Sequence, residues 1–334
     1  METPYYVVSW DDKGRLVRLY DKGADREVIP EGKFANVIQI FEDKPRCFDA
    51  WELEATIDLK KEEIPCDGNI IKTKNELGYF IHFTYNYNNS KIMQTLCLYN
   101  DKRRIDFKTV VDWKESQKIL KTAFSVDIRG VFARYDVQEG NIVRPITRNT
   151  SWEAAKFEVV AHKWADLSET GYGVALLNDC KYGYDIKEDT MRLSLLKSAT
   201  DPDYSADYGT HEFTYSLYPH KEEWYNSGLE EEAFDLNSPV VVLDGASALG
   251  NESLISFDAK NIVLDAFKKA ENEEAYVLRF HEYTGRRGKI NLKTGLNFDS
   301  WCESDLMENP LGEWKQTAIE VEVKPYEIKT IMLK

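Results

Sequence analysis

The sequence predicts an all-β protein made of a large domain followed by a small one. Apolar and polar residues alternate with a period of two along most of the 334 residues, as in strands that bury one face. Short clusters of Gly, Asn, Asp and Ser separate these runs, as turns do. The best helix candidate is one short acidic segment, residues 221–236. We therefore expect antiparallel sheets and little helix.

The first predicted element is a β-hairpin. Residues 5–10 and 15–20 are rich in aromatic and β-branched side chains, and the Asp and Gly residues of segment 11–14 supply the turn between them. Alternating runs then predict strands at residues 70–73, 78–87, 91–99, 104–113 and 118–126. Polar clusters separate these runs, so we expect an antiparallel meander.

The middle of the chain continues with shorter strands and longer loops. Strands are expected at residues 157–161, 173–177, 191–196 and 211–218, and extended structure resumes at residues 240–243. Small residues cluster at 244–250 and indicate a seam between a first domain, residues 1–245, and a second, residues 250–334. The second domain is expected to be a small β-sandwich with strands at residues 253–256, 262–267, 275–282, 288–292, 318–323 and 328–333.

Charge and cysteine content exclude several classes of protein. A net charge of −15, from 58 acidic and 43 basic residues, argues against a nucleic-acid partner, which requires a basic surface. No apolar run approaches the roughly 18 residues of a membrane helix, so we expect no membrane partner. The five cysteines are odd in number and form no Cys-x-x-Cys pair, which argues against a disulfide framework. With no signal peptide in view, the sequence predicts a cytoplasmic protein.

Catalytic and metal-binding motifs do not emerge from the residues. The five histidines lack the spacing of hydrolytic zinc ligands. His211-Glu212 and His281-Glu282 begin like His-Glu-x-x-His, but Tyr215 and Gly285 occupy the fifth positions. There is no Gly-x-Ser-x-Gly nucleophile motif either. We therefore expect no catalytic residue, no metal ligand and no cofactor in this chain.

Two loops, residues 144–152 and 201–211, combine polar and aromatic side chains as sugar-binding sites do. Amides and charged groups exchange hydrogen bonds with hydroxyl groups, and an aromatic ring stacks on C–H groups. The Asp residues of the second loop also allow a calcium site, although the EF-hand pattern fails, and both loops could equally be structural. The candidate sugar contacts are Arg148, Asn149, Trp152, Asp203, Asp207 and His211.

Several segments, taken in order, resemble glycoside hydrolase family 38, the α-mannosidases, in its C-terminal region and most of all its cytosolic-type branch. The chain begins this likeness at residues 14–22 and continues it at 41–52. Arg148-Asn149-Thr150-Ser151-Trp152 is similar to a family signature. Further matching segments are residues 162–169, 172–179, 211–220 and 324–331. The resemblance covers essentially the whole chain.

This resemblance implies a β supersandwich, like that of galactose mutarotase, followed by a small β-sandwich. It also implies that the complete enzyme cleaves α-mannosides with retention, using an N-terminal catalytic barrel that carries the nucleophile, the acid/base carboxylate and the zinc ligands. The family's zinc ligands include a His-x-Asp pair, which no position here matches. The chain is thus expected to be the non-catalytic C-terminal portion, with the catalytic barrel and the α-mannoside as its partners and with loops 144–152 and 201–211 on one wall of the mannose pocket.

Two alternatives remain open. A stand-alone carbohydrate-binding module would share the sandwich and the aromatic loops, and would bind a mannoside by itself. A sugar epimerase of the mutarotase type needs a His acid and a Glu base, for which His162 or His211 could face Glu158 or Glu212. A C-terminal portion should also present an apolar face, through which copies of the chain could form a homo-oligomer.

Overall fold

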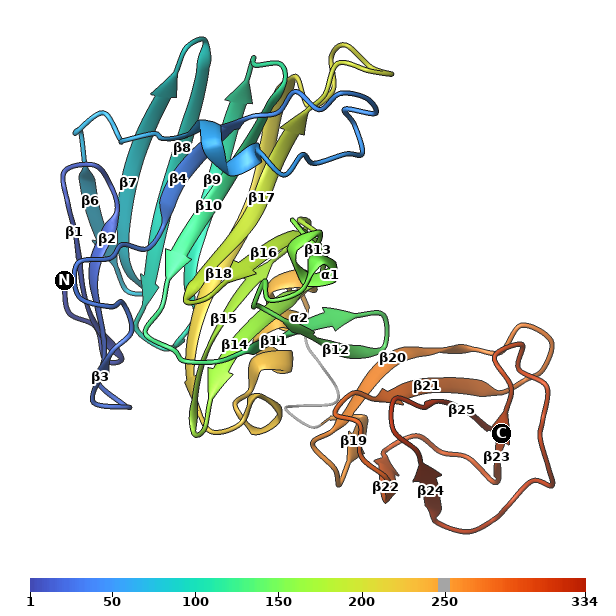
Figure 1. Cartoon of the computed structure of the whole chain (residues 1–334). Helices are drawn as coiled ribbons and strands as arrows, with labels where there is room; N and C mark the ends of the chain where they lie inside the picture. Colours follow the sequence, from blue (N-terminus) through green and yellow to red (C-terminus); the bar gives the residue numbers. More distant parts are fainter. Residues whose placement is uncertain (246–252) are drawn as a thin grey trace. The chain divides into compact units, whose positions relative to one another are not determined.

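The all-β prediction is confirmed by the computed structural model, which describes residues 1–245 and 253–334 (Figure 1). The chain divides into two units. The first comprises residues Met1–Asp136 and Ile142–Pro239, and the second comprises Val137–Asn141 and Val240–Lys334. Most of the predicted seam, residues 246–250, lies outside the described residues.

Two large sheets form the first unit, with a small sheet beside them. The small sheet has the order β1 (Tyr6–Trp10), β2 (Leu16–Asp21), β3 (Arg26–Glu27). The nine-stranded sheet has the order β12 (Gly140–Pro145), β11 (Phe132–Val137), β14 (Trp164–Glu169), β15 (Tyr172–Asn178), β18 (Gly209–Lys221), β9 (Ile105–Trp113), β8 (Ser90–Tyr99), β7 (Gly78–Tyr87), β6 (Ile71–Asn75). The six-stranded sheet has the order β13 (Val159–Val160), β16 (Gly183–Lys187), β17 (Thr190–Ser198), β10 (Lys118–Ser125), β4 (Val37–Glu42), β5 (Lys61–Glu63).

The core of the first unit lies between the six- and nine-stranded sheets. Phe107 of β9 stacks on Tyr215 of the neighbouring strand β18, with ring centroids 5.2 Å apart, and meets Phe124 of β10 edge-on at 5.4 Å. All three side chains are fully buried. Because Phe124 belongs to the opposite sheet, this cluster joins the two layers. The alternation that predicted strands 104–113 and 118–126 therefore supplies the two faces of one sandwich.

The predicted helix 221–236 is only partly correct. Strand β18 continues to Lys221, a short 3₁₀ helix η2 follows (Trp224–Asn226), and the α-helix α2 spans Leu229–Asn237. Gly228 precedes α2 with φ of +81°, a conformation that glycine adopts at little cost, so the chain turns there and begins the helix anew. The other helices are η1 (Ile57–Lys60) and α1 (Ser151–Ala154). No helix among the described residues has the length and apolarity needed to cross a lipid bilayer.

The second unit is a smaller pair of sheets. One has the order β19 (Ile255–Phe257), β22 (Gly288–Thr294), β24 (Ile319–Val323), and the other has the order β20 (Ile262–Lys269), β21 (Tyr276–Glu282), β25 (Ile328–Leu333), β23 (Trp301–Ser304). Its core contains Phe280, Trp301 and Ile331. The extended structure expected at residues 240–243 is no strand: its apolar side chains are 79–86 % exposed, so they have no sheet partner to bury them.

Candidate functional site

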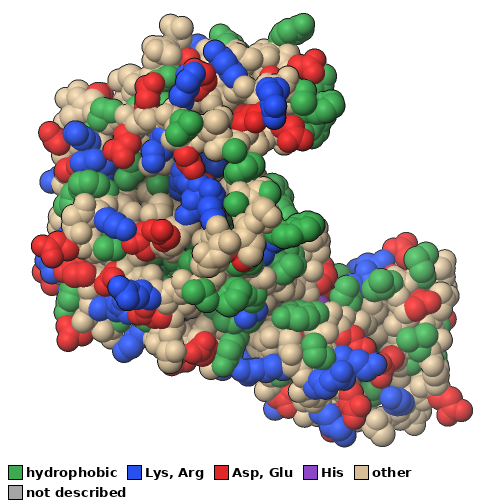
Figure 2. Space-filling view, in the orientation of Figure 1, with side chains coloured by type: hydrophobic (Ala, Val, Ile, Leu, Met, Phe, Trp, Pro, Cys, Tyr) green, Lys and Arg blue, Asp and Glu red, His purple; other side chains and the backbone are tan. Residues whose placement is uncertain are grey.

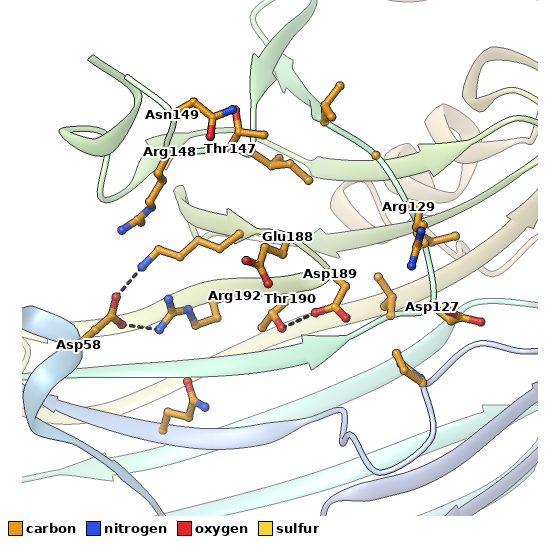
Figure 3. A pocket seen from close by; sticks show the side chains of 18 of the residues that line it. Asp58, Asp127, Arg129, Thr147, Arg148, Asn149, Glu188, Asp189, Thr190 and Arg192 are labelled. Carbon is orange, nitrogen blue, oxygen red and sulfur yellow. Dashed lines mark hydrogen bonds and ion pairs between the residues drawn. The ribbon is translucent and has the colours of Figure 1, made fainter. Parts of the chain in front are cut away.

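A groove of about 1180 Å³ in the first unit is the candidate site (Figure 3). It is bordered by η1, by the loop after β10, by the loop after β12 and by the turn between β16 and β17. Figure 2 shows a hollow in the face of this unit where Lys and Arg side chains gather. The charged residues that line the groove are Asp58, Lys61, Asp127, Arg129, Arg148, Lys187, Glu188, Asp189 and Arg192.

Two carboxylates organise the cations of this groove. Asp58 accepts a hydrogen bond from Lys187 and one of 2.8 Å from Nη1 of Arg192. The other amino group of Arg192, Nη2, lies 2.9 Å from Oδ2 of Asp185. Arg192 and Asp185 have side chains only 8 % and 6 % exposed, so this pair interacts in a medium that screens charge poorly. Lys187 and Arg192 are therefore held at the groove by ion pairs with Asp58 and Asp185.

Asp58 remains a carboxylate at neutral pH. Burial raises the pKa of Asp58, but the hydrogen bonds and positive charges of Lys187 and Arg192 outweigh burial and hold that pKa well below its usual range. A general acid for glycoside cleavage requires the opposite, a carboxyl group that keeps its proton near neutral pH. The Asp58 carboxylate can accept hydrogen bonds from a ligand, but it cannot deliver a proton.

Arg148 and Asn149, two of the predicted contacts, line the groove beside this network. Arg148 is one-third exposed and its Nη2 lies 3.9 Å from Oδ1 of Asp185, so its guanidinium keeps hydrogen-bonding capacity for a ligand. The loop owes its shape to Glu153, which accepts hydrogen bonds from the backbone N–H of Asn149 (2.8 Å) and from the hydroxyl of Thr147 (3.0 Å). Glu153 thereby holds Arg148 and Asn149 at the groove.

Trp152, the third predicted contact of this loop, lies on α1 and does not line the groove. Its side chain is 83 % exposed. Helix α1 begins where the hydroxyl of Thr150 accepts a hydrogen bond of 3.2 Å from the N–H of Glu153, a capping arrangement that local sequence determines. The structure thus brings Arg148 and Asn149 together and leaves the ring of Trp152 at the surface.

The second predicted loop, residues 201–211, contributes nothing to the groove lining. Asp203 accepts hydrogen bonds from the N–H and the hydroxyl of Ser205, at 2.9 and 2.8 Å. Asp207 accepts one from the N–H of Lys197 (2.8 Å), and Nε2 of His211 bonds to the carbonyl oxygen of Asp207 (2.8 Å). These three side chains shape their own loop. The calcium alternative would need several acidic side chains of this loop to lie close together. Among the described residues, Asp203, Asp207 and His211 do not belong to any group of three or more His, Cys, Asp or Glu side chains close enough to share a metal ion.

Three of the four residues considered for an epimerase, Glu158, His162 and His211, contact other groups. Glu158 accepts a hydrogen bond from Ser194 and lies 3.6 Å from Nζ of Lys121. The ring of His162 meets the ring of Tyr182 edge-on, with centroids 5.4 Å apart. In the part of the chain that the structure describes, no recorded hydrogen bond or ion pair joins His162 or His211 to Glu158 or Glu212.

Sequence analysis missed Asp58, Asp185, Lys187 and Arg192. One available signal was the position of Arg192 between the apolar residues Met191 and Leu193, within the predicted strand 191–196. A buried arginine in such a strand requires a carboxylate partner. Its partner Asp58, however, lies 134 residues earlier in the chain, so the sequence gives no spacing by which to pair them.

Comparison with known proteins gives consistent matches along the chain. Residues 1–205 match the family described as "Glycosyl hydrolases family 38 C-terminal domain", and residues 261–331 match "Glycosyl hydrolases family 38 C-terminal beta sandwich domain". Alpha-mannosidase G of Dictyostelium discoideum is 35 % identical in an alignment 334 positions long that covers 95 % of this chain and 31 % of that protein. Alpha-mannosidase 2C1 of Homo sapiens is 34 % identical in an alignment 338 positions long that covers 98 % of this chain and 32 % of that protein.

The chain thus spans about a third of the length of these curated relatives. Among solved structures, an alpha-mannosidase from Enterococcus faecalis superposes with a TM-score of 0.80 at 16 % identity, covering 100 % of this chain and 42 % of that one. At this level of identity the likeness establishes the fold alone. The part of the Enterococcus faecalis protein that matches this chain therefore has the same two-unit β fold.

Proposed function

Because this chain belongs to glycosyl hydrolase family 38, whose C-terminal region it represents, we propose that it is the non-catalytic C-terminal part of a retaining α-mannosidase. Two family matches and curated relatives named as α-mannosidases support this proposal. The observation that carries it is the continuous match to proteins about three times as long. The groove agrees in one respect, because Asp58 in its lining is ionised and paired with Lys187 and Arg192 and so does not supply the proton donor of glycoside cleavage.

This proposal also implies the partner, the metal ion and the substrate of the complete enzyme. The N-terminal catalytic barrel of the same protein is the main partner and the place of the zinc ion, and an α-mannoside is the substrate. The residues of the groove do not suit the zinc, because no group of three His, Cys, Asp or Glu ligands forms there among the described residues. The five cysteines are free thiols, two of them exposed, which supports a reducing, cytoplasmic location.

We further propose that loops 144–152 and 201–211 form part of one wall of the mannose pocket. Arg148 and Asn149 can bond to sugar hydroxyls from the groove. In the second loop, Asp203, Asp207 and His211 maintain the backbone, and the exposed rings of Tyr204 and Tyr208 (86 % and 59 % exposed) are free to stack on a sugar face. Trp152, 83 % exposed, offers a similar ring.

The central test measures hydrolysis of p-nitrophenyl α-mannoside with zinc or cobalt supplied. We expect no hydrolysis by this chain alone and hydrolysis by the complete protein, because a retaining glycosidase needs a nucleophile and a proton donor that this chain does not supply. Activity from the chain alone would contradict the proposal. Tight binding of a mannoside by the chain alone, without hydrolysis, would instead support the stand-alone binding module, and rapid aldose anomerisation would support the epimerase.

In the complete protein, changing Arg148 to alanine should lower kcat/KM for the α-mannoside by about 10–100-fold, since a charge-assisted hydrogen bond contributes roughly 1.5–3 kcal/mol. A matched control is Arg18→Ala, which removes a half-exposed arginine of β2 that pairs with Glu27 and does not line the groove. Equal kinetics for both variants would show that Arg148 does not contact the substrate. Unchanged melting temperatures would confirm that the loss is one of contact and not of folding.

A further inference from the structure

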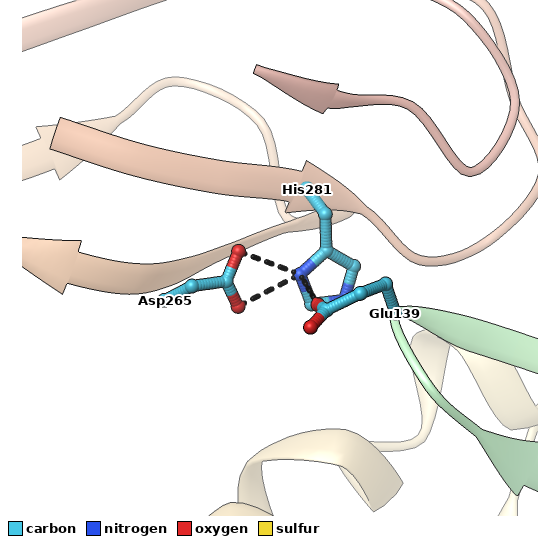
Figure 4. Close-up of side chains that lie close together, drawn as sticks. All are labelled: Glu139, Asp265 and His281. Carbon is cyan, nitrogen blue, oxygen red and sulfur yellow. Dashed lines mark hydrogen bonds and ion pairs between the residues drawn. The ribbon is translucent and has the colours of Figure 1, made fainter. Parts of the chain in front are cut away.

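Three side chains of the second unit converge outside the groove (Figure 4). Nδ1 of His281 lies 2.9 and 3.0 Å from the two carboxylate oxygens of Asp265 and 2.9 Å from Oε2 of Glu139. One ligand atom from each of the three residues lies within 4.8 Å of the other two. Among the described residues this is the one such group of His, Cys, Asp or Glu side chains.

The fold brings these residues together from two distant parts of the chain. His281 lies on β21 opposite Val263 of β20, and the register of the two strands shifts between Leu264 and Ala266. Asp265 is therefore the extra residue of a β-bulge, a feature that redirects a side chain. Glu139 lies in the turn between β11 and β12 with φ of +51°, a backbone conformation that favours glycine.

The two carboxylates at this point have no lysine or arginine partner among the described residues. A ring nitrogen carries at most one hydrogen, yet three carboxylate oxygens lie within 3.0 Å of Nδ1. The His281 side chain is only 6 % exposed, so water solvates the nitrogen poorly. Two carboxylates held so close together repel each other, and a cation between them relieves that repulsion.

We propose that Glu139, Asp265 and His281 bind one divalent transition-metal ion, with zinc as the best match. An imidazole nitrogen with two carboxylate oxygens suits Zn²⁺, which binds such ligands at about 2.0–2.2 Å and accepts water as its fourth ligand. The side chains of Asp265 and Glu139 are 22 % and 43 % exposed, so an ion and its water can enter from that side. Nδ1 gives up its proton to solvent when the metal binds.

Such an ion would act as a structural link inside the second unit. It would join the turn that holds Glu139 to strands β20 and β21, although 126 residues separate Glu139 from Asp265 in the sequence. Because the three ligands are brought together only by folding, the ion would bind the native chain and stabilise it.

The test titrates the chelator-treated 334-residue chain with Zn²⁺ by calorimetry and with Co²⁺ by visible absorption. We expect one ion per chain, a Co²⁺ spectrum typical of nitrogen and oxygen ligands, and a higher melting temperature with Zn²⁺. Asp265→Asn preserves the shape and a hydrogen-bond acceptor for His281, so the chain should still fold. It should weaken zinc binding by about 100-fold. Loss of a group that only orients a metal ligand already weakens binding by roughly 10–100-fold, and Asp265 is proposed as a ligand itself.

His82→Gln is the matched control. His82 is a half-buried histidine of the first unit whose ring bonds to Thr95 and Thr73, and its variant should bind zinc like the original chain. The proposal is overturned if the original chain binds neither Zn²⁺ nor Co²⁺ at this stoichiometry. It is also overturned if Asp265→Asn and His82→Gln bind equally well. In either case a protonated His281 is the cation that the two carboxylates share.

Discussion

Changing Asp106 to alanine should lower the free energy of unfolding by about 3–5 kcal/mol, because it removes the most buried of the three carboxylates that pair with Arg104 and leaves only the more exposed Glu232 and Asp235. Nε of Arg104 donates a hydrogen bond of 2.8 Å to Asp106, and the two side chains are 6 % and 3 % exposed. Asp106 also accepts hydrogen bonds from Ser216 (2.7 Å) and Tyr99 (2.9 Å). The substitution therefore removes the acceptor of three donors, of which Arg104 and Ser216 are buried and Tyr99 is partly buried.

The same strand offers a control. Asp112, also on β9, pairs with Lys114 at 2.7 Å, but these side chains are 42 % and 39 % exposed. Asp112→Ala should cost about 1 kcal/mol or less, because water screens an exposed pair. Urea denaturation followed by tryptophan fluorescence compares the two. Similar losses for both variants would show that burial does not set the strength of the Asp106 network.

Changing Phe107 to alanine should destabilise the chain by about 3–5 kcal/mol, the range for deleting a fully buried aromatic ring. The ring of Phe107 packs on Tyr215 and Phe124 at 5.2 and 5.4 Å, so its loss opens a cavity between the two large sheets. Neighbouring strands restrain the backbone on both sides, and the cavity cannot collapse fully. The midpoint of urea denaturation should fall with little change in slope.

Phe132 of β11 provides the comparison for Phe107. It is 56 % exposed, and Phe132→Ala should change the free energy of unfolding by about 0.5 kcal/mol or less. A loss for Phe132→Ala as large as that for Phe107→Ala would contradict the placement of the core between the six- and nine-stranded sheets.

Local patterns predicted much of the fold. The hairpin expected at residues 5–10 and 15–20 corresponds to β1 and β2, and the runs at 78–87, 91–99 and 104–113 correspond to β7, β8 and β9. Strand β23 was missed, because Trp301–Ser304 has only four residues and shows no alternation of its own. The helix expected from residue 221 begins at Leu229, because β18 is held to Lys221 by pairing with Tyr172 of β15.

The candidate site was predicted less completely than the fold. Arg148 and Asn149 were proposed as sugar contacts because they lie in a loop dense in polar and aromatic residues, and the structure places both in the groove lining. The pairing of Asp58 with Arg192 was not predicted, because the two residues are 134 positions apart in the sequence. His281 was considered for metal binding only with its sequence neighbours, whereas Asp265 and Glu139 meet it through a bulge and a distant turn.

The sequence by itself determined the β class, the position of many strands, the family resemblance and the polar loop that borders the groove. These features depend on alternation, turn residues and short motifs, which act over a few neighbouring residues. Only the tertiary structure decided three contacts between distant residues. Asp58 accepts a hydrogen bond from Arg192, Asp106 accepts a hydrogen bond from Ser216, and Glu139 lies beside His281. Such meetings depend on strand order and register, which arise when distant segments bury their apolar faces together, and so no local spacing in the chain records them.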